Sequence, residues 1–383
     1  MSHTRARVAL VQRVVPHYNL IFYQKLLASS RHDWEFVYGN HAGRGESGLA
    51  TNAEAILPTR TIRNVEIGKA LWQAGVTRWV RERRYEAVVF ELGWQIVSNS
   101  VVVSVAHQVG AVAIPWTKGI SESGRPRPAW RRRIERAFIR NCDALLAYGH
   151  VSADYFVRYG YPRERIFVAQ NTVDVREIAR RIPAAQAGAA TLRKRLDLQG
   201  RLVFGYLGRL VSQKRVDWII DAFVDARTTG LDAVLIIAGD GPNRGALESR
   251  ANTSRCAEAI FFCGRVPESQ VDAYFEIFDI FISAYSAGLA ILEAMAHAKV
   301  VVTTPENRPE TEMVRDGITG FVTVDYSVAA LADGLRRAAV SVHSGQPVGQ
   351  RAQETVLSNA TMENMVDAFD RAISFALEAR ARR

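Results

Sequence analysis

The stretch FISAYSAGLAILEAMAHAK, residues 281–299, joins an apolar strand pattern to a helical pattern through a bare turn. The apolar run ends at Ile282, and residues 289–295 are strong helix formers that include one acid, Glu293. The small residues up to Gly288 let a ligand approach the backbone, and a helix that begins there presents unpaired N–H groups to an anion. The stretch therefore predicts a site for a phosphate with a sugar attached, where Glu293 accepts hydrogen bonds from vicinal hydroxyls. The alternative is an ordinary strand–helix connection with an exposed glutamate.

The same alternation of strand and helix patterns extends over the whole chain. Short, nearly continuous apolar runs lie at 7–12, 34–39, 87–91, 111–115, 144–148 and 166–169, and again at 202–208, 233–239, 259–264, 280–283 and 300–304. Such runs are typical of parallel strands that helices cover on both faces. The pattern predicts an α/β fold with two Rossmann-like, doubly wound domains facing across a cleft.

A change in composition separates the two sets of strands. Residues 176–200 are rich in alanine, glycine and charge, which indicates a linker region. We predict a first domain at 1–180, a linker at 181–200, a second domain at 201–355 and a C-terminal helical segment at 356–383. We expect the last helix to cross back to the first domain.

Composition restricts the partners and the compartment. The net charge of +10 favours anionic partners such as nucleotides or an acidic membrane face. Nucleic acid is not expected, because the basic residues are spread widely and no basic motif is interleaved with aromatic residues. Three cysteines without ligand spacing indicate reduced thiols in a cytoplasmic protein. The N-terminus lacks a secretion signal pattern, and the uncharged window 95–117 reads as a helix, a turn at Gly110 and a strand rather than a membrane span.

Two cations and a glycine turn follow strands of the second half. Arg209 and Lys214 come after the strand at 202–208, and Gly239 and Gly241 form a turn after the strand at 233–239. Ligands of open α/β sheets bind beyond the carboxyl ends of the strands. An arginine fork and a lysine point charge at this edge suit a diphosphate. A nicotinamide dinucleotide is disfavoured, because GDGPNRG departs from the G-x-G-x-x-G spacing.

The order of these segments resembles the family 4 (group 1) glycosyltransferases of the GT-B fold. The resemblance is carried by FGYLGRLVSQK, LIIAGDGPNRG, FFCGRVPES and GLAILEAMAHAK, within about 200–325. In the first half, RYGYPRERIFVAQNTVD resembles the segment that joins the family's domains, and VQRVVPHYN resembles the first strand and loop of some members.

The resemblance implies a donor site in the second domain and an acceptor site in the first. Arg209 and Lys214 match the pair that binds the donor diphosphate, and Glu293 matches the acid that holds the donor ribose. These three residues are the implied catalytic set. The other implied donor-binding positions are Gly208, Gly239, Gly241, Arg265 and Val266 at the base pocket, Tyr285, Gly288, Leu289 and Ala290.

Two departures from the family pattern concern the sugar and the acceptor. Tyr285 stands where the family has an acid that contacts donor-sugar hydroxyls, and losing such a charged hydrogen bond costs about 1.5–3 kcal/mol. Tyr285 either supplies a neutral hydroxyl or a stacking face, or packs in a weakened enzyme. The acceptor-side histidine of many members is also missing from AIPWTKGIS, which leaves Lys118 and His17 as the candidates on that side.

The resemblance also implies retention of configuration by a front-face route in which the departing diphosphate takes the acceptor proton. The protein then supplies electrostatic stabilisation rather than a nucleophile. No cofactor is expected beyond the nucleotide-sugar substrate, whose base, UDP or GDP type, stays open. Because no D-x-D pair occurs in the chain, we expect no metal ion in donor binding.

The most basic stretch, residues 125–140, predicts an amphipathic helix. Trp130 begins an apolar face, and Arg131, Arg132 and Arg133 flank it. One interpretation is a contact with an anionic membrane or with a lipid-linked acceptor. The other is a domain helix that packs its apolar face on its own sheet.

We therefore predict a cytoplasmic hexosyltransferase that uses a nucleotide-sugar donor in cell-surface glycan, polysaccharide or glycolipid assembly, with a peripheral position at the inner face of the plasma membrane as an option. The acceptor is a glycan, a lipid-linked glycan or a small molecule. One alternative is a weakened or non-enzymatic donor-binding partner subunit, which Tyr285 suggests. Another is a sugar-nucleotide epimerase, which is disfavoured because His297 is the only histidine between 201 and 325.

Overall fold

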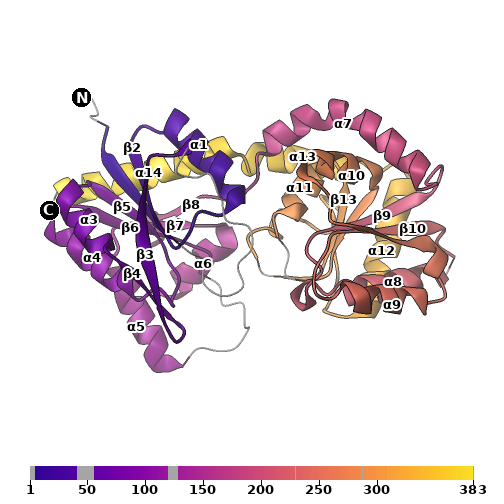
Figure 1. Ribbon diagram of the computed structural model, residues 1–383, viewed down its shortest axis with the longest axis horizontal. Helices are drawn as coiled ribbons and strands as arrows, with labels where there is room; N and C mark the ends of the chain where they lie inside the picture. Colours follow the sequence, from indigo (N-terminus) through magenta and orange to yellow (C-terminus); the bar gives the residue numbers. More distant parts are fainter. Residues whose placement is uncertain are drawn as a thin grey trace. The chain divides into compact units, whose positions relative to one another are not determined.

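The computed structural model describes residues 5–40, 56–119, 128–228, 230–285, 288–306 and 308–382. The chain forms two compact units, the first from Met1–Asn171 with Met362–Arg383 and the second from Thr172–Thr361 (Figure 1). Each unit is an α/β structure built on a largely parallel sheet, which confirms the predicted fold class.

The sheet of the first unit has the strand order β4-β3-β2-β1-β5-β6-β7-β8. Its strands are β1 (Arg7–Gln12), β2 (Asp33–Gly39), β3 (Thr59–Ile67), β4 (Ala70–Ala74), β5 (Ala87–Glu91), β6 (Val112–Thr117), β7 (Leu145–Ala147) and β8 (Ile166–Val168). Neighbouring strands pair in parallel except for the β3–β4 hairpin. The sequence did not predict this hairpin, because β4 is the edge strand and much of β3 beside it is exposed, so β3 lacks a continuous apolar run.

Helices cover both faces of this sheet. The helices of the first unit are α1 (Leu20–Ser29), α3 (Val76–Arg83), α4 (Ser98–Gln108), α5 (Ala129–Arg140), α6 (His150–Arg158) and α14 (Met362–Ala381). Alternate residues of β1 point to opposite faces, so Val8 and Leu10 join a core with α1 and α14, whereas Ala9 and Val11 join a core with α3 and α4.

The last helix, α14, is an integral part of the first unit. The ring of Phe369 meets those of Phe22 at 5.2 Å and Trp116 at 5.2 Å between centroids. Near the end of the helix, Arg380 Nη1 donates to the Ala111 carbonyl at 2.7 Å. Aromatic contact and a cationic hydrogen bond therefore fix this helix along its length.

The sheet of the second unit has the order β11-β10-β9-β12-β13-β14, with every pair parallel. Its strands are β9 (Leu202–Leu207), β10 (Ala233–Ala238), β11 (Ile260–Gly264), β12 (Ile280–Ser283), β13 (Val300–Thr303) and β14 (Phe321–Val322). This is the Rossmann order 3-2-1-4-5-6, in which the chain reverses direction across the sheet between β9 and β12. Ligands of such sheets bind at this switch point.

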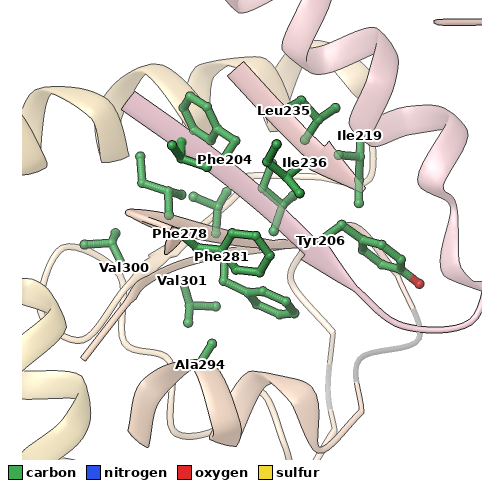
Figure 2. Close-up of a cluster of buried hydrophobic side chains, with 14 of the residues drawn as sticks. Phe204, Tyr206, Ile219, Leu235, Ile236, Phe278, Phe281, Ala294, Val300 and Val301 are labelled. Carbon is green, nitrogen blue, oxygen red and sulfur yellow. The ribbon is translucent and has the colours of Figure 1, made fainter. Parts of the chain in front are cut away.

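Two sets of helices cover the faces of the second sheet (Figure 1). One set is α8 (Val216–Thr228), α9 (Arg244–Asn252) and α12 (Val328–His343); the other is α7 (Val175–Arg195), α10 (Val271–Ile277), α11 (Ala290–Ala296) and α13 (Val348–Asn359). Figure 2 shows the tightly packed core between sheet and helices, including Phe204, Ile236 and Phe281. Gly205 is needed in β9, because a Cβ there would lie 2.2 Å from Cγ of Phe278.

The domain boundaries differ from the predicted ones. The first unit ends at Asn171 rather than at residue 180, and residues 181–200 are not a separate linker. Most of them belong to α7, whose Ala189 and Leu192 are buried in the core of the second unit. The alanine, leucine and arginine that resemble a linker are also strong helix formers, and Asp174 caps the helix by accepting from the Glu177 amide at 3.2 Å.

Candidate functional site

The loops after β9, β10 and β11 are joined by backbone hydrogen bonds at the carboxyl edge of the second sheet. Gly208 N donates to Ala238 O at 3.0 Å, and Gly239 N donates to Gly264 O at 2.7 Å. One turn further, Leu210 N donates to Asp240 O at 2.9 Å. The residues predicted to hold a diphosphate thus follow a rigid set of turns.

Gly239 and Gly241 are required by the approach of two loops. Gly239 has a φ of +147°, and a Cβ there would lie 1.8 Å from Gly208 O. A Cβ at Gly241 would lie 2.4 Å from Leu210 O. The close backbone approach expected at this turn is therefore made by the neighbouring loop of the protein itself.

Lys214 lies against Gly288, the residue that ends the predicted bare turn. A Cβ at Gly288 would lie 3.5 Å from Lys214 Nζ, so the ammonium group reaches the loop after β12 from the loop after β9. Gly288 itself is half-buried, and α11 begins two residues later at Ala290. Ser286 and Ala287, in the same predicted turn, lie outside the described residues.

Lys214 is surrounded by charged groups of both signs. Burial lowers the pKa of Lys214, and the nearby guanidinium groups of Arg209 and Arg308 lower it further. The carboxylates of Glu306 and Glu310 act in the opposite direction but do not cancel the effect. Three cations and two acids therefore share this neighbourhood, and a bound anion would stabilise the charged form of Lys214.

Arg209 is placed at the same edge with its side chain exposed. Its carbonyl accepts a hydrogen bond from the buried Tyr206 hydroxyl at 2.9 Å, which fixes the backbone of the loop. Arg265 is also exposed, whereas Val266 is half-buried and packs on the core, as do Leu289 and Ala290.

Glu293 lies on α11 and faces the neighbourhood of α10 and α7. Burial raises the pKa of Glu293 to about 7, and the carboxylates of Asp272 and Glu268 add to this effect, while Arg181 opposes it. Asp272 is held in place by Arg181 Nε at 2.9 Å and lies 3.3 Å from Nε2 of the buried His297. Glu268, two residues after Val266, acts on the Glu293 carboxyl, so the 265–266 segment lies close in sequence to a group that Glu293 senses.

Tyr285 packs against a second tyrosine. Its ring meets that of Tyr326 edge-on at 5.8 Å, and the Tyr326 hydroxyl donates to Pro305 O at 3.1 Å. The loop after β13, which contains Glu306 and Arg308, is thereby brought to the site. Glu306 and Arg308 were not predicted from the sequence, because their place beside Tyr285 depends on the register between β12 and β13.

The two acceptor-side candidates lie at the carboxyl edge of the first sheet. His17 follows β1 and is exposed, with its ring edge-on to Tyr18 at 5.5 Å. Lys118 follows β6 and is half-buried. Only β5 separates these strands in the sheet, so both side chains stand where a parallel sheet binds its ligands.

Helix α5 buries only the C-terminal end of the apolar face that the sequence suggested, where Phe138 packs with Phe90 and Trp94. Trp130 is 64% exposed and Ile134 is 60% exposed. The buried face carries Glu135 and Ile139 instead, with Arg131 Nε paired to Glu135 Oε1 at 3.1 Å. Packing on its own sheet therefore explains Phe138 but not Trp130 and Ile134. Arg132 and Arg133 are exposed beside it, and residues 125–127 lie outside the described part of the chain.

The described residues contain neither a metal-binding cluster nor a helix fit to cross a membrane. No group of three or more histidine, cysteine, aspartate or glutamate side chains there is arranged to hold a metal ion. No helix within the described ranges combines the length and the apolar character that a membrane-spanning segment needs.

Solved structures share this fold over nearly the whole chain. Alr3699/HepE of Anabaena, crystallised in complex with UDP, has a TM-score of 0.74 at 16% identity and covers 96% of this chain and 99% of its own. A glycosyltransferase from Rickettsia africae has a TM-score of 0.79 at 15% identity, with 98% and 99% covered. Two Rossmann-like units with cations at one switch point thus define the GT-B class.

The family follows from the sequence comparisons. Residues 189–352 match the profile of the glycosyl transferases group 1, and residues 24–177 match that of glycosyltransferase family 4. The chain belongs to this family of glycosyltransferases, which confirms the resemblance.

Curated relatives are similar over parts of their length. Alpha-D-kanosaminyltransferase of Streptomyces kanamyceticus is 28% identical over 40% of this chain and 40% of its own. Alpha-monoglucosyldiacylglycerol synthase of Streptococcus pneumoniae is 25% identical over 54% and 47%. A GDP-mannose-dependent phosphatidylinositol monomannoside mannosyltransferase of Mycolicibacterium smegmatis is 32% identical over 40% and 44%. The chain spans about half the length of the curated relatives that it matches.

Proposed function

We propose that this protein transfers a hexose from a nucleoside diphosphate sugar to an acceptor hydroxyl. The observation that carries the proposal is the position of Lys214, whose Nζ lies against Gly288 while Arg209 and Arg308 lie near it at the switch point. A cluster of cations with a depressed lysine pKa is costly without a ligand, and a diphosphate would offset that cost. The diphosphate is also the group on which negative charge grows as the glycosidic bond breaks.

The nucleoside would extend from the diphosphate toward α10. Glu293 is placed to accept hydrogen bonds from the ribose hydroxyls, and Val266 offers an apolar contact to the base next to the exposed Arg265. Complexes of the structural neighbour HepE with UDP and with UDP-glucose support a uridine or similar nucleotide as the first probe.

The transfer would proceed with retention, without a metal ion and without a cofactor. In this scheme, Arg209 and Lys214 stabilise the departing diphosphate, and one of its oxygens accepts the acceptor proton on the same face of the sugar. Positive charge from side chains takes the part that a divalent cation plays in enzymes with a D-x-D pair, which this chain lacks.

The acceptor would be a glycan or a glycolipid at a membrane surface, with His17 and Lys118 on the acceptor side. The names of the pneumococcal and mycobacterial relatives refer to lipid acceptors, which supports this class. On the first unit, the exposed Trp130 and Ile134 lie among exposed arginines, as suits an anionic bilayer. The protein would then work in the cytoplasm, bound peripherally at the inner face of the plasma membrane.

Binding to vesicles tests the membrane contact. Wild-type protein should co-sediment with vesicles containing anionic lipid more than with neutral vesicles, and Trp130→Ser/Ile134→Ser should lose most of this binding. Val340→Ser is the matched control, because Val340 is an exposed apolar residue of a helix in the second unit. Equal binding to neutral and anionic vesicles would contradict the contact.

A ligand panel followed by a turnover assay tests the transferase proposal. A nucleoside diphosphate at about 100 times its dissociation constant should stabilise the protein by about 2.7 kcal/mol, which a thermal shift detects. The sugar nucleotide that binds is then incubated with lipid and glycan acceptors, and release of the nucleoside diphosphate is measured. Binding without turnover on any acceptor would favour the partner-subunit function that Tyr285 suggests.

A further inference from the structure

The loop after β13 brings a buried ion pair to the proposed donor pocket. We propose that Glu306 is the carboxylate that accepts hydrogen bonds from the hydroxyls of the transferred sugar, and that Arg308 positions it. This inference rests on the proposed function, since it deepens the description of the same donor site. It assigns sugar recognition to a residue outside the positions that the sequence patterns indicated.

Strand register places Glu306 next to the loop that carries Tyr285. Strands β12 and β13 run in parallel, with Ser283 opposite Thr303. The alignment continues past the strands, because Thr304 Oγ1 donates to Ala284 O at 2.7 Å. One residue further along each of the two segments stand Tyr285 and Pro305. Tyr326 links them, because its ring packs edge-on against the Tyr285 ring and its hydroxyl donates to the Pro305 carbonyl. Glu306 follows Pro305 directly, so it is one residue beyond the position opposite Tyr285.

The carboxylate of Glu306 is held in a defined position. Only 2% of the Glu306 side chain and 13% of the Arg308 side chain are exposed, and Arg308 Nε lies 2.6 Å from Glu306 Oε2. The Thr311 hydroxyl fixes the loop, since Thr311 Oγ1 lies 2.5 Å from Glu306 O and 3.0 Å from Arg308 O. Because the carboxylate is buried and paired with Arg308, it is held in one position and is preorganised for a ligand.

The same carboxylate lies within electrostatic reach of the diphosphate cations. Of the two carboxylates that raise the pKa of Lys214, Glu306 has the larger effect, and Arg308 acts on Lys214 with the opposite sign; the Lys214 ammonium group lies against Gly288. Glu306 therefore lies at the same edge of the sheet as the cations that would hold the diphosphate. A diphosphate bound by Lys214 would compete with Glu306 for this positive charge, which would favour hydroxyl donors to the carboxylate.

The chemistry of the alternatives favours Glu306 over Tyr285 for this role. A tyrosine has one neutral hydroxyl, whereas a carboxylate accepts two hydrogen bonds from neighbouring sugar hydroxyls. A hydrogen bond to a charged group contributes more than one between neutral groups, which corresponds to about 10- to 150-fold in binding. Because the nucleoside diphosphate alone lacks the sugar, this contact should distinguish the sugar nucleotide from its free diphosphate.

Calorimetric titration of Glu306→Gln with UDP and UDP-glucose, or with GDP and GDP-mannose if only the guanine nucleotide binds, tests the proposal. The substitution keeps the shape and removes the charge. We expect the affinity for the diphosphate to stay the same or rise, while the affinity for the sugar nucleotide and the transfer rate fall about 10- to 150-fold. Glu258→Gln is the matched control, because Glu258 is an exposed acid before β11, at the opposite edge of the sheet.

A rescue variant separates sugar recognition from a purely structural role. Tyr285→Glu in the Glu306→Gln background returns a carboxylate from the adjacent loop and should restore part of the preference for the sugar nucleotide. If Glu306→Gln does not fold, Glu306→Asp keeps the charge and should weaken sugar binding alone, because the side chain is one methylene shorter. An unchanged ratio of the two affinities in Glu306→Gln or Glu306→Asp would overturn this inference alone. A wild-type protein that binds no nucleoside diphosphate would overturn the proposed function itself.

Discussion

Replacing Glu293 by glutamine should make the protein more stable at neutral and alkaline pH but not at acid pH. Burial, with the carboxylates of Asp272 and Glu268, raises the pKa of Glu293 from 4.5 to about 7. The ionised form is therefore disfavoured in the folded protein relative to the unfolded chain. Glutamine keeps the size of the side chain and removes the ionisation, so it isolates this effect.

The magnitude follows from linkage. Below pH 4.5 the carboxyl is protonated in both states, so the variant and wild type should be equally stable. Between pH 4.5 and 7 the unfolded chain releases its proton first, so wild-type stability falls by about 1.4 kcal/mol per pH unit. Above pH 7 the full difference is reached, at most about 3.4 kcal/mol for a pKa raised from 4.5 to about 7. Because Glu293 is half-buried, water reduces this value.

The assay is urea unfolding of both proteins at pH 4, 5, 6, 7 and 8, with Glu354→Gln, an exposed acid of α13, as the control. The difference in unfolding free energy between Glu293→Gln and wild type should rise from zero at pH 4 to a plateau above pH 7. A difference that is constant with pH, or that falls as pH rises, would refute the reasoning.

Three further predictions concern the diphosphate site and its scaffold. Arg209→Ala or Lys214→Ala should lower the transfer rate about 100-fold or more, since one aligned donor in a comparable oxyanion site contributes about 2.7–4 kcal/mol; near-wild-type turnover would remove these residues from the mechanism. Activity should survive EDTA, whereas loss on chelation and recovery with manganese would show that a metal ion takes part. Gly239→Ala should destabilise the fold by at least about 2 kcal/mol, because its Cβ would meet Gly208 O at 1.8 Å at a φ of +147°. Gly245→Ala, which meets no atom within 4 Å in a helix, should be neutral or stabilising in the same melting experiment, and equal effects would contradict the packing argument.

Apolar runs predicted the buried strands well, because a short, continuous apolar run in an α/β fold rarely forms anything other than a buried parallel strand. The second sheet is the clear case, since the predicted runs coincide with β9 to β13 within a residue or two. The β3–β4 hairpin was missed because an edge strand half in water has no continuous apolar run. The helix α7 was taken for a linker because composition alone does not distinguish a helix from an alanine-rich connection.

The part of the site that could be predicted from the sequence is the one whose residue types have a single common role at the ends of parallel strands. A glycine pair and two cations after parallel strands indicate a phosphate site, and the structure brings Lys214 to Gly288. Glu306 and Arg308 were out of reach, because their role depends on the register between β12 and β13, which no local pattern encodes. The role of the apolar face of α5 could not be predicted from the sequence either, because apolar residues at helical spacing suit both a protein core and a membrane surface.

The central claim is that cations from the loops of the second unit form one diphosphate pocket at the switch point. Calorimetric titration of UDP and GDP against the corresponding monophosphates, on wild type, Lys214→Met and Lys194→Met, tests it most directly. Lys194 is exposed near the end of α7, which leads to the amino end of β9, so it is the matched control. Wild type and Lys194→Met should prefer a diphosphate over its monophosphate by about 10-fold or more, and Lys214→Met should lose that preference. The same preference in Lys214→Met as in wild type would contradict the account.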